Sequence, residues 1–221
     1  MSPGPSVGNH PRIDIGSVQA RALVCTDCRL AETRTQVVWS TGNLDSDVLF
    51  IGEAPGFHED KQGVAFVGAA GKLLDTVLSE VGLDRTQVAI VNVIKCRPPN
   101  NRDPLPDEIE ACRPYLEAQL GHMRPAVIVT LGNFATRFIT GLQIGITKAR
   151  GQLFEYQGAT VIPTFHPAAA LRGGRFGGMS PVDAIRADLA SVRRILDEKR
   201  TRGTSGTEDE AGVPSEQLGL F

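Results

Sequence analysis

The chain has 221 residues, a formal net charge of −2, 41% hydrophobic residues, 5% aromatic residues and four cysteines. This length fits one domain with a sizeable core, and no apolar run approaches the roughly 20 residues that span a bilayer, so we expect no membrane association. The start of the chain has no apolar stretch typical of a secretory signal, which predicts a cytoplasmic protein. In that compartment cysteines are more often metal ligands or catalysts than disulfides. The slightly acidic charge by itself argues against a nucleic-acid partner.

The two ends of the chain differ from its middle. Residues 1–16 hold three prolines and three glycines without periodicity, which predicts a flexible N-terminal arm. Residues 203–221 hold four acids, no Lys or Arg, and many Gly, Ser, Thr and Pro, which is typical of a disordered tail. The folded domain is therefore expected at 17–202. Without the four tail acids, 21 acidic residues face 23 basic ones, so this domain carries a charge of +2.

Between these ends, short apolar runs alternate with helical patterns in chain order. Near-continuous β-formers, which suit parallel strands covered on both faces, occur at 48–51, 88–93, 126–129 and 161–163. Apolar residues at helical spacing predict helices over 72–81, 106–120, 133–140 and 181–199. The alternation predicts an α/β fold, a three-layer α/β/α sandwich around a central, mainly parallel sheet of about four strands.

Glycine-rich and polar segments follow each predicted strand. Gly52-Glu53-Ala54-Pro55-Gly56 follows the first strand, Asn92 ends the second, Gly132-Asn133 follows the third and His166-Pro167 follows the fourth. Ligands of parallel sheets bind beyond the carboxyl ends of the strands, so we expect these segments to converge on one binding edge.

The four cysteines match a four-ligand metal site. Cys25 and Cys28 form a C-x-x-C pair, and Cys96 and Cys112 lie sixteen residues apart farther along the chain. Four thiolates suit either zinc or an iron–sulfur cluster. Two other interpretations stay open on these residues alone: buried free cysteines, which behave as small hydrophobes, and a redox dithiol at the C-x-x-C pair.

Several blocks in this order carry a family resemblance. G-E-A-P-G-x-x-E-D spans residues 52–60, and the stretches 63–68 and 95–102 are followed by H-P-x-x-x-L-R at 166–172. With the cysteine spacing, these blocks make residues 20–175 resemble the family 4 uracil-DNA glycosylases. The resemblance implies a DNA-repair enzyme that flips uracil out of single- or double-stranded DNA and hydrolyses its N-glycosidic bond, leaving an abasic site. It also implies one [4Fe-4S] cluster held by Cys25, Cys28, Cys96 and Cys112, with zinc less favoured.

The resemblance assigns the uracil pocket residue by residue. Phe66 matches the residue that stacks on the base, and Asn92 matches the residue whose amide pairs with uracil and rejects cytosine. Glu59 matches the position that crowds the C5 edge and keeps out the methyl group of thymine. Glu53, Ala54 and Pro55, in the turn after the first predicted strand, complete the uracil-binding set together with His166. An Asn within an apolar strand is costly without a partner, which independently favours a ligand role for Asn92.

The resemblance also assigns the chemistry. His166 matches the histidine that donates a hydrogen bond to uracil O2 as negative charge develops on the departing base. The first uracil-DNA glycosylase family has an aspartate where this chain has Ala54, so the attacking water needs another partner, and Glu53 and Asn101 are the two unranked candidates. The chain also lacks the inserted Lys-Arg-Arg-Ile-His loop of a neighbouring branch that traps the sugar covalently, which predicts release of free uracil.

DNA contacts are expected at the loop cations Arg97, Arg102 and Arg172 and at Leu171, where the resemblance places a loop that probes the duplex. We expect a monomer in the cytoplasm, associated with the nucleoid. The alternative function is a non-catalytic DNA-binding or sliding-clamp adaptor module that contains a four-cysteine metal site.

The last five residues suggest a protein partner. Gln217, Leu218, Leu220 and Phe221 match the short Q-L-x-L-F peptide with which bacterial repair and replication proteins engage the sliding clamp. An amide and large apolar groups on a flexible tether suit a shallow pocket on a partner, so we expect clamp binding through this tail.

Overall fold

The four apolar runs form the inner, parallel strands of the central sheet. The computed structural model describes residues 13–173, 175 and 177–205. Its sheet has six strands in the order β1-β3-β2-β4-β6-β5. The inner strands are β2 (Val48–Gly52), β3 (Ala89–Asn92), β4 (Val127–Leu131) and β6 (Ala159–Thr164), and their pairings with one another are parallel. The predicted α/β fold and its parallel core are confirmed.

Two short edge strands complete the sheet. β1 (Thr41–Gly42) pairs antiparallel with β3, and β5 (Phe154–Tyr156) pairs antiparallel with β6. The sequence did not predict either strand, because segments of two and three residues are too short to show a hydrophobic period.

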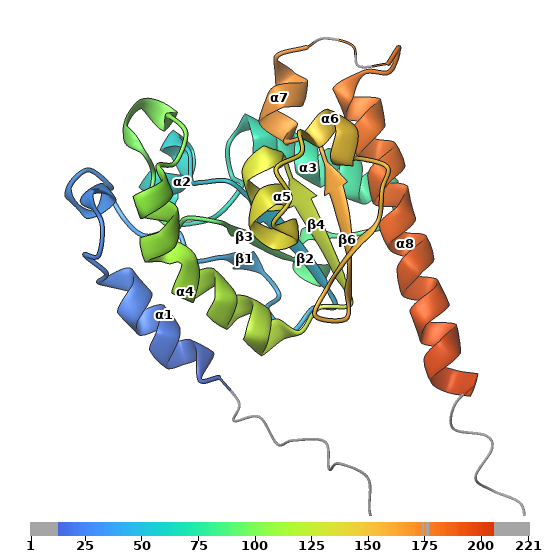
Figure 1. Ribbon diagram of the computed structural model, residues 1–221, viewed down its shortest axis with the longest axis horizontal. Coiled ribbons are helices and arrows are strands. Elements are labelled where there is room, and N and C mark those ends of the chain that lie inside the picture. The colour runs from blue at the N-terminus through green and yellow to red at the C-terminus, as the bar shows by residue number, and fades with distance from the viewer. Residues whose placement is uncertain (1–12, 174, 176, 206–221) are drawn as a thin grey trace, which may run out of the picture.

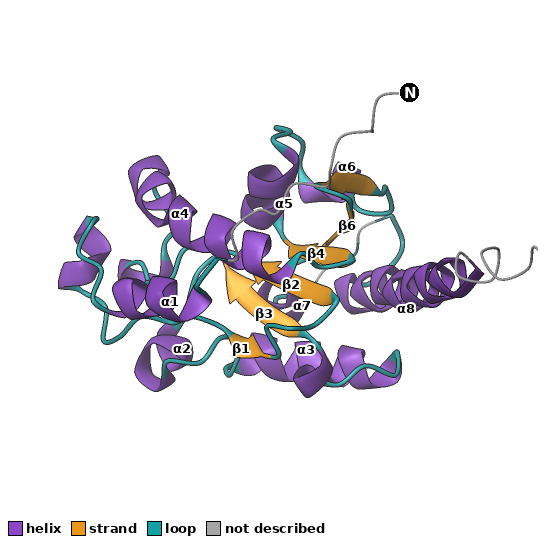
Figure 2. Cartoon of the chain, turned by 90° about the horizontal axis from the view of Figure 1, so that it is seen from below, coloured by secondary structure: helices purple, strands orange, loops and turns teal. Residues whose placement is uncertain are grey.

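Long helices cover both faces of the sheet (Figures 1 and 2). On one face, α3 (Ala69–Glu80) and α8 (Pro181–Ser205) pack against the sheet. On the other face lie α4 (Pro106–Met123) and α5 (Asn133–Thr140). All four helices were predicted from periodicity, and α5 has the predicted bounds.

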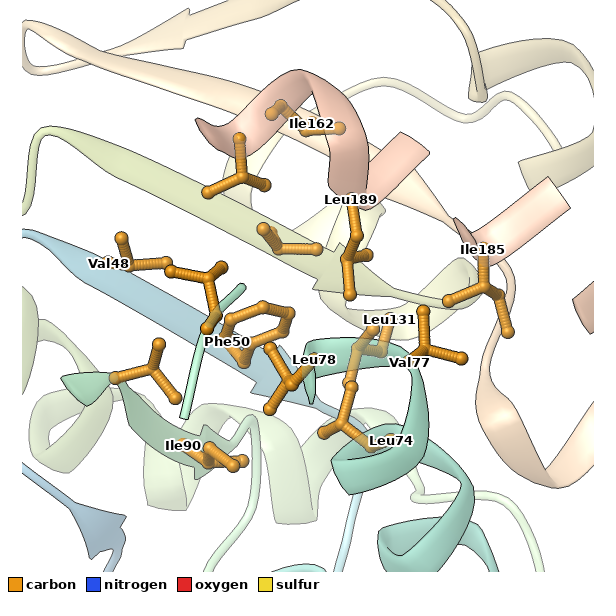
Figure 3. Close-up of a cluster of buried hydrophobic side chains, with 14 of the residues drawn as sticks. Val48, Phe50, Leu74, Val77, Leu78, Ile90, Leu131, Ile162, Ile185 and Leu189 are labelled. Carbon is orange, nitrogen blue, oxygen red and sulfur yellow. The ribbon is translucent and has the colours of Figure 1, made fainter. Parts of the chain in front are cut away.

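Side chains of each inner strand alternate between two apolar clusters because successive residues of a strand face opposite ways. Phe50 and Ile90 pack with Leu74 of α3 and Leu189 of α8, and Figure 3 shows this cluster. The opposite cluster, beneath α4 and α5, includes Leu49, Ile51, Val91, Leu116 and Ile139. Burial on both faces explains why the strands read as continuous apolar runs.

The folded part begins earlier and ends later than expected. Helix α1 (Ile15–Leu23) starts two residues before position 17, where Asp14 caps it by accepting a hydrogen bond from the Ser17 N–H at 3.2 Å. At the other end, α8 runs to Ser205, past the expected boundary at 202. The rest of the predicted arm and tail, at 1–12 and 206–221, lies outside the described residues.

Short helices occupy the connections between the strands and the long helices. They are α2 (Phe57–Gln62), α6 (Ile146–Ala149) and α7 (Pro167–Leu171), together with the 3-10 turns η1 (Arg29–Glu32), η2 (Arg85–Gln87) and η3 (Pro99–Asn101). The arrowheads of β4 and β6 in Figure 1 point toward the end of the molecule where α6 and α7 lie. In the described part of the chain, no helix is long and apolar enough to cross a bilayer.

Candidate active site and cysteine centre

The last residue of β2 brings the predicted pocket residues together. Gly52 is the register partner of Asn92 in the neighbouring strand β3. A Cβ atom on Gly52 would lie 2.4 Å from Asn92 Oδ1 and 2.6 Å from Cε2 of Phe66. Only a residue without a side chain fits this position, and its absence lets the amide and the aromatic ring approach the strand end.

Asn92 carries an unused hydrogen-bonding atom inside the protein. Its side chain is 2% exposed, and within the described residues its Oδ1 has no hydrogen-bond partner. Leaving a buried polar atom unpaired costs about 1–3 kcal/mol, so an oxygen in this state indicates a donor supplied by a ligand.

Phe66 and His166 face each other at the same site. Their ring centroids are 5.6 Å apart with an interplanar angle of 34°. Phe66 is buried and has the left-handed φ of 55°, which is rare for a residue with a bulky side chain. His166 lies close to Gly132 after β4, where a Cβ atom would be 3.2 Å from the His166 Cβ. The ends of β2, β3, β4 and β6 thus converge as expected.

His166 is held in a defined protonation state by its surroundings. Its Nδ1 accepts a hydrogen bond from the N–H of Ala168 at 3.1 Å, so the proton of the neutral ring is on Nε2. Burial, and secondly the positive charge of Arg172, lower the pKa of His166 to about 4, while Glu59 acts in the opposite direction. At neutral pH the side chain is therefore an uncharged hydrogen-bond donor.

The strand end before His166 is anchored to the last helix. Thr164 Oγ1 donates a hydrogen bond to Oδ2 of Asp188 in α8 at 2.6 Å. The Arg150 guanidinium pairs with the same carboxylate at 3.1 Å, and both acid and hydroxyl are buried. This arrangement fixes the backbone two residues before the histidine.

The two candidates for holding water differ in their surroundings. Burial, with a smaller contribution from Asp103, raises the pKa of Glu53 to about 7, and Arg172 opposes this shift. Asn101 is exposed in η3, and its Oδ1 already accepts a hydrogen bond from Arg97 Nε at 2.7 Å. Arg172 thus acts electrostatically on both Glu53 and His166, whereas the Asn101 oxygen is already paired with Arg97.

Glu59 supports the loop that carries the stacking ring. Its Oε1 accepts hydrogen bonds from the N–H groups of Val67 and Gly68 at 2.9 and 2.8 Å. Pro55 is buried, and Ala54 packs against the apolar cluster under α4. Glu59 also lies against the turn after β2, where a Cβ atom on Gly56 would be 2.7 Å from its Oε2.

The residues expected to contact DNA differ in their exposure and in their partners within the protein. Leu171 is 52% exposed at the end of α7 and Arg172 follows it on the surface. The Arg97 guanidinium lies 5.1 Å from the ring centroid of the exposed Phe57. Arg102 instead binds the fully buried carboxylate of Glu108 through both Nη atoms, at 2.9 and 2.6 Å. Its guanidinium holds the start of α4, which the sequence did not indicate.

All four cysteines line one cavity. Cys25 and Cys28 follow α1, Cys96 follows β3, and Cys112 lies on α4. Arg34 Nη1 lies 3.4 Å from Cys96 Sγ, and the N–H of Lys95 donates to Cys112 Sγ at 3.2 Å. Donors of this kind favour thiolate sulfur.

The cavity gathers four thiol groups that could hold a metal group. Among the described His, Cys, Asp and Glu residues, no three are placed as ligands of a single metal ion. Zinc requires its four sulfurs about 2.3 Å from one centre, whereas a cluster spaces its cysteines more widely. Burial raises the pKa of Cys112 and raises that of Cys96 to about 11, so the thiolates need positive charge from a bound metal.

Lys95 links the cysteines to the pocket. Its side chain is 1% exposed, and its Nζ donates to the Asn92 carbonyl oxygen at 2.7 Å and to Gln119 Oε1 at 2.6 Å. Burial lowers the pKa of Lys95 to about 8. The sequence did not single out Lys95; its place directly after the apolar run Val91–Ile94 was the one available signal.

Comparison with known proteins identifies the family. The family model of the uracil DNA glycosylase superfamily matches residues 39–190. The type-4 uracil-DNA glycosylase of Thermotoga maritima is 50% identical over 157 residues, covering 70% of this chain and 82% of that protein. That of Sulfurisphaera tokodaii is 47% identical over 163 residues, covering 70% of this chain and 74% of that protein. The chain belongs to the type-4 branch of the uracil-DNA glycosylase superfamily.

Similarity extends beyond this branch at lower identity. The type-5 uracil-DNA glycosylase of Pyrobaculum aerophilum is 30% identical over 145 residues, which cover 58% of this chain and 63% of that protein. The predicted family is confirmed by the family model and the type-4 relatives, and the role of each pocket residue stays a prediction.

The Glu53→Gln substitution should stabilise the protein in a pH-dependent way. Because the folded pKa of Glu53 is raised from 4.5 to about 7, ionisation costs more in the folded state than in the unfolded state. Stability contributed by the protonated form is therefore lost as pH rises through this window. Chemical unfolding should show Glu53→Gln more stable than the parent near pH 8, with the gain shrinking toward about pH 4.

Glu155→Gln, which changes an exposed carboxylate on β5, is the matched control and should show no such trend. An equal stabilisation by Glu53→Gln at both pH values would contradict the raised pKa.

Proposed function

We propose that the protein is a DNA-repair glycosylase that excises uracil from DNA by hydrolysing the N-glycosidic bond. The observation that carries the proposal is the buried, unpartnered Asn92 Oδ1 at the same site as Phe66 and His166. The type-4 relatives are named uracil-DNA glycosylases, which supports the same activity. A non-catalytic adaptor would leave this oxygen and the neutral His166 without a role.

Base recognition follows from the side chains around Gly52. An extruded uracil stacks on the Phe66 ring, and its N3–H donates to the free Oδ1 of Asn92. The amide nitrogen of Asn92 then faces the O4 carbonyl. Cytosine presents an acceptor at N3 and donors at N4, so it would leave two buried polar atoms unpaired. Glu59 holds the loop beside the base and narrows the space at its C5 edge.

His166 acts on the departing base. Its Nε2–H donates a hydrogen bond to uracil O2, where negative charge grows as the glycosidic bond breaks. Because the pKa of His166 is about 4, its ring is neutral at neutral pH and donates this hydrogen bond without transferring the proton to uracil. Arg172, which lowers that pKa, adds positive potential on the same side of the site.

Glu53 is the proposed partner of the attacking water. With a pKa raised to about 7, its carboxylate is partly ionised at neutral pH and accepts a hydrogen bond or proton from water. A transition state in which the sugar is already cationic requires little basicity, so a moderately basic carboxylate suffices.

Substituting Asn92 should remove most of the activity on uracil. Asn92→Ala deletes both hydrogen bonds to the base, and we expect kcat/KM on a uracil-containing oligonucleotide to fall by about 100-fold or more. Release of free uracil and alkali-labile strand breaks measure the reaction. The control is Asn43→Ala. It removes an exposed amide whose Oδ1 accepts a hydrogen bond from the Asp45 N–H at 2.9 Å in a surface turn.

A parent protein that releases no uracil would overturn the proposed activity. Parent-like kcat/KM for Asn92→Ala would instead overturn the assigned mode of base recognition.

For the metal centre we propose one [4Fe-4S] cluster bound by Cys25, Cys28, Cys96 and Cys112. The shared cavity and the type-4 family membership support this choice over zinc. When bound, the cluster supplies a cross-link between the segment after α1, the end of β3 and α4. Lys95, next to Cys96, holds the Asn92 carbonyl, so this cross-link also steadies the base-reading residue.

Purified protein should contain about four irons per chain and absorb visible light through thiolate-to-iron charge transfer. Cys112→Ser should lose iron and unfold at lower temperature, because the cavity then keeps three thiolates. Thr26→Ala, an exposed change between the first two cysteines, is the control and should keep the iron. One zinc per chain and a colourless sample would contradict the cluster.

For the DNA-facing surface we propose Leu171, Arg172 and Arg97. The guanidinium of Arg102 is used by Glu108, so Arg102 contributes through the fold of this region. A monomer acting in the cytoplasm, at the nucleoid, stays our prediction.

The replication sliding clamp is the proposed protein partner of the C-terminal tail. The terminal Q-L-x-L-F peptide supports it, although residues 217–221 lie outside the described part of the chain. A link to replication is also supported by a DNA polymerase of Bacillus phage SP01. That protein is 32% identical over 171 residues, which cover 77% of this chain and 18% of the polymerase.

Deleting residues 217–221 should abolish binding to an immobilised bacterial sliding clamp while leaving uracil release from short oligonucleotides intact. Deleting residues 208–212 removes an equal length of acidic tail and should leave clamp binding unchanged. Undiminished clamp binding after loss of the last five residues would refute the partner assignment.

A further inference from the structure

The stacking residue has an unfavourable backbone conformation that its neighbours must maintain. Phe66 has φ of 55°, in the left-handed region that strongly favours glycine. Such a conformation persists at a residue with a large side chain only where surrounding groups fix it, and it is typical of functional sites. The ring direction of Phe66 depends on this backbone.

Arg85 binds the two carbonyl groups on either side of this strained residue. Its Nη1 donates to the Ala65 carbonyl oxygen at 3.1 Å, and its Nη2 donates to that of Phe66 at 2.6 Å. Arg85 belongs to η2, nineteen residues after Phe66, and its Nε donates to Asp75 of α3 at 2.7 Å. All three nitrogens of the guanidinium are thus used, and Asp75 sets its orientation.

Two other contacts hold the same loop from different sides. The Phe66 carbonyl lies against the backbone of α3, where a Cβ on Gly71 would be 1.8 Å from that oxygen. Glu59 accepts from the next two N–H groups, those of Val67 and Gly68. Arg85 therefore binds the carbonyl groups, and Glu59 binds the N–H groups, of the short segment from Ala65 to Gly68. The Phe66 ring of this segment lies beside Gly52.

We infer that Arg85, oriented by Asp75, is a positioning residue for uracil recognition. It keeps Phe66 in the left-handed conformation that presents its ring to the extruded base, although Arg85 itself does not contact the base. The inference rests on the proposed function. A planar fork with donors on separate nitrogens matches two adjacent carbonyls, whereas the single ammonium of a lysine does not.

The inference separates base binding from bond cleavage. Without Arg85 the backbone of Phe66 can relax to a negative φ, and the ring leaves the stacking position. Stacking contributes to holding the base, while Asn92 and His166 stay on their own strand ends. We therefore expect weaker uracil binding, with a smaller effect on kcat at saturating substrate and no effect on binding of uracil-free DNA.

The test compares two arginines that both form an ion pair with α3. Arg85→Met removes the hydrogen bonds to the Ala65 and Phe66 carbonyls and the ion pair with Asp75. Arg186→Met removes the ion pair between Arg186 Nε of α8 and Glu80 Oε2 of α3, 2.6 Å apart, which does not involve the Phe66 loop. For Arg85→Met we expect KM for uracil-containing DNA and the inhibition constant of free uracil to rise by about 10-fold. Arg186→Met should keep the parent values, and Arg85→Lys should restore little.

A milder variant guards against misfolding. Asp75→Asn keeps the arginine but weakens its orientation, so KM and the inhibition constant of uracil should rise in the same direction by a smaller factor. If Arg85→Met lowers the melting temperature as Arg186→Met does but keeps both constants at parent values, Arg85 is merely structural and the inference fails.

A second readout does not depend on catalysis. Backbone scalar couplings of Phe66, measured by NMR, should leave the left-handed range in Arg85→Met and stay there in Arg186→Met. An unchanged φ in Arg85→Met would overturn the inference even if the parent enzyme cleaves uracil. A parent enzyme without uracil activity would instead overturn the proposed function, leaving the conformational result to decide the role of Arg85.

Discussion

The close approach of three chain segments at Gly52 is the constraint on which the site depends. Parallel register sets Gly52 beside Asn92, and the missing Cβ leaves room for the Asn92 oxygen and the edge of the Phe66 ring. A single methyl group there would overlap both. The amide of Asn92 and the ring of Phe66 therefore lie close together because β2 ends in a residue without a side chain. His166 joins them through its contact with the Phe66 ring.

Burial at this site suppresses charge on both an acid and a base. The same loss of solvent raises the pKa of Glu53 to about 7 and lowers that of His166 to about 4. Arg172 favours the ionised carboxylate of Glu53 and the neutral imidazole of His166 alike, while Asp103 and Glu59 act on them in the opposite direction. A neutral donor for the base and a weakly basic carboxylate for water are suited to a reaction in which the substrate itself separates charge.

The sequence predicted what depends on local pattern or on motif. The four inner strands and the four long helices followed from hydrophobic period, and Asn92, Phe66 and His166 from the resemblance blocks. Helix α1 was missed because Val18 and Ala22 are its only buried residues. Arg85 was missed because its partners lie ten to twenty residues away, and Lys95 because a charged side chain in sequence gives no sign that it is buried. Arg102 was predicted to contact DNA because the sequence does not show that its guanidinium pairs with the buried carboxylate of Glu108 in the folded protein.

The anchoring of Thr164 to Asp188 has a consequence for how the protein is made. Asp188 lies in α8, the last helix of the described chain, and its carboxylate fixes the strand end that carries His166. The same helix covers one face of the sheet through Ile185 and Leu189. During translation the histidine leaves the ribosome before the helix that secures it. The nascent chain therefore holds every pocket residue named above before α8 is available to secure the strand end next to His166.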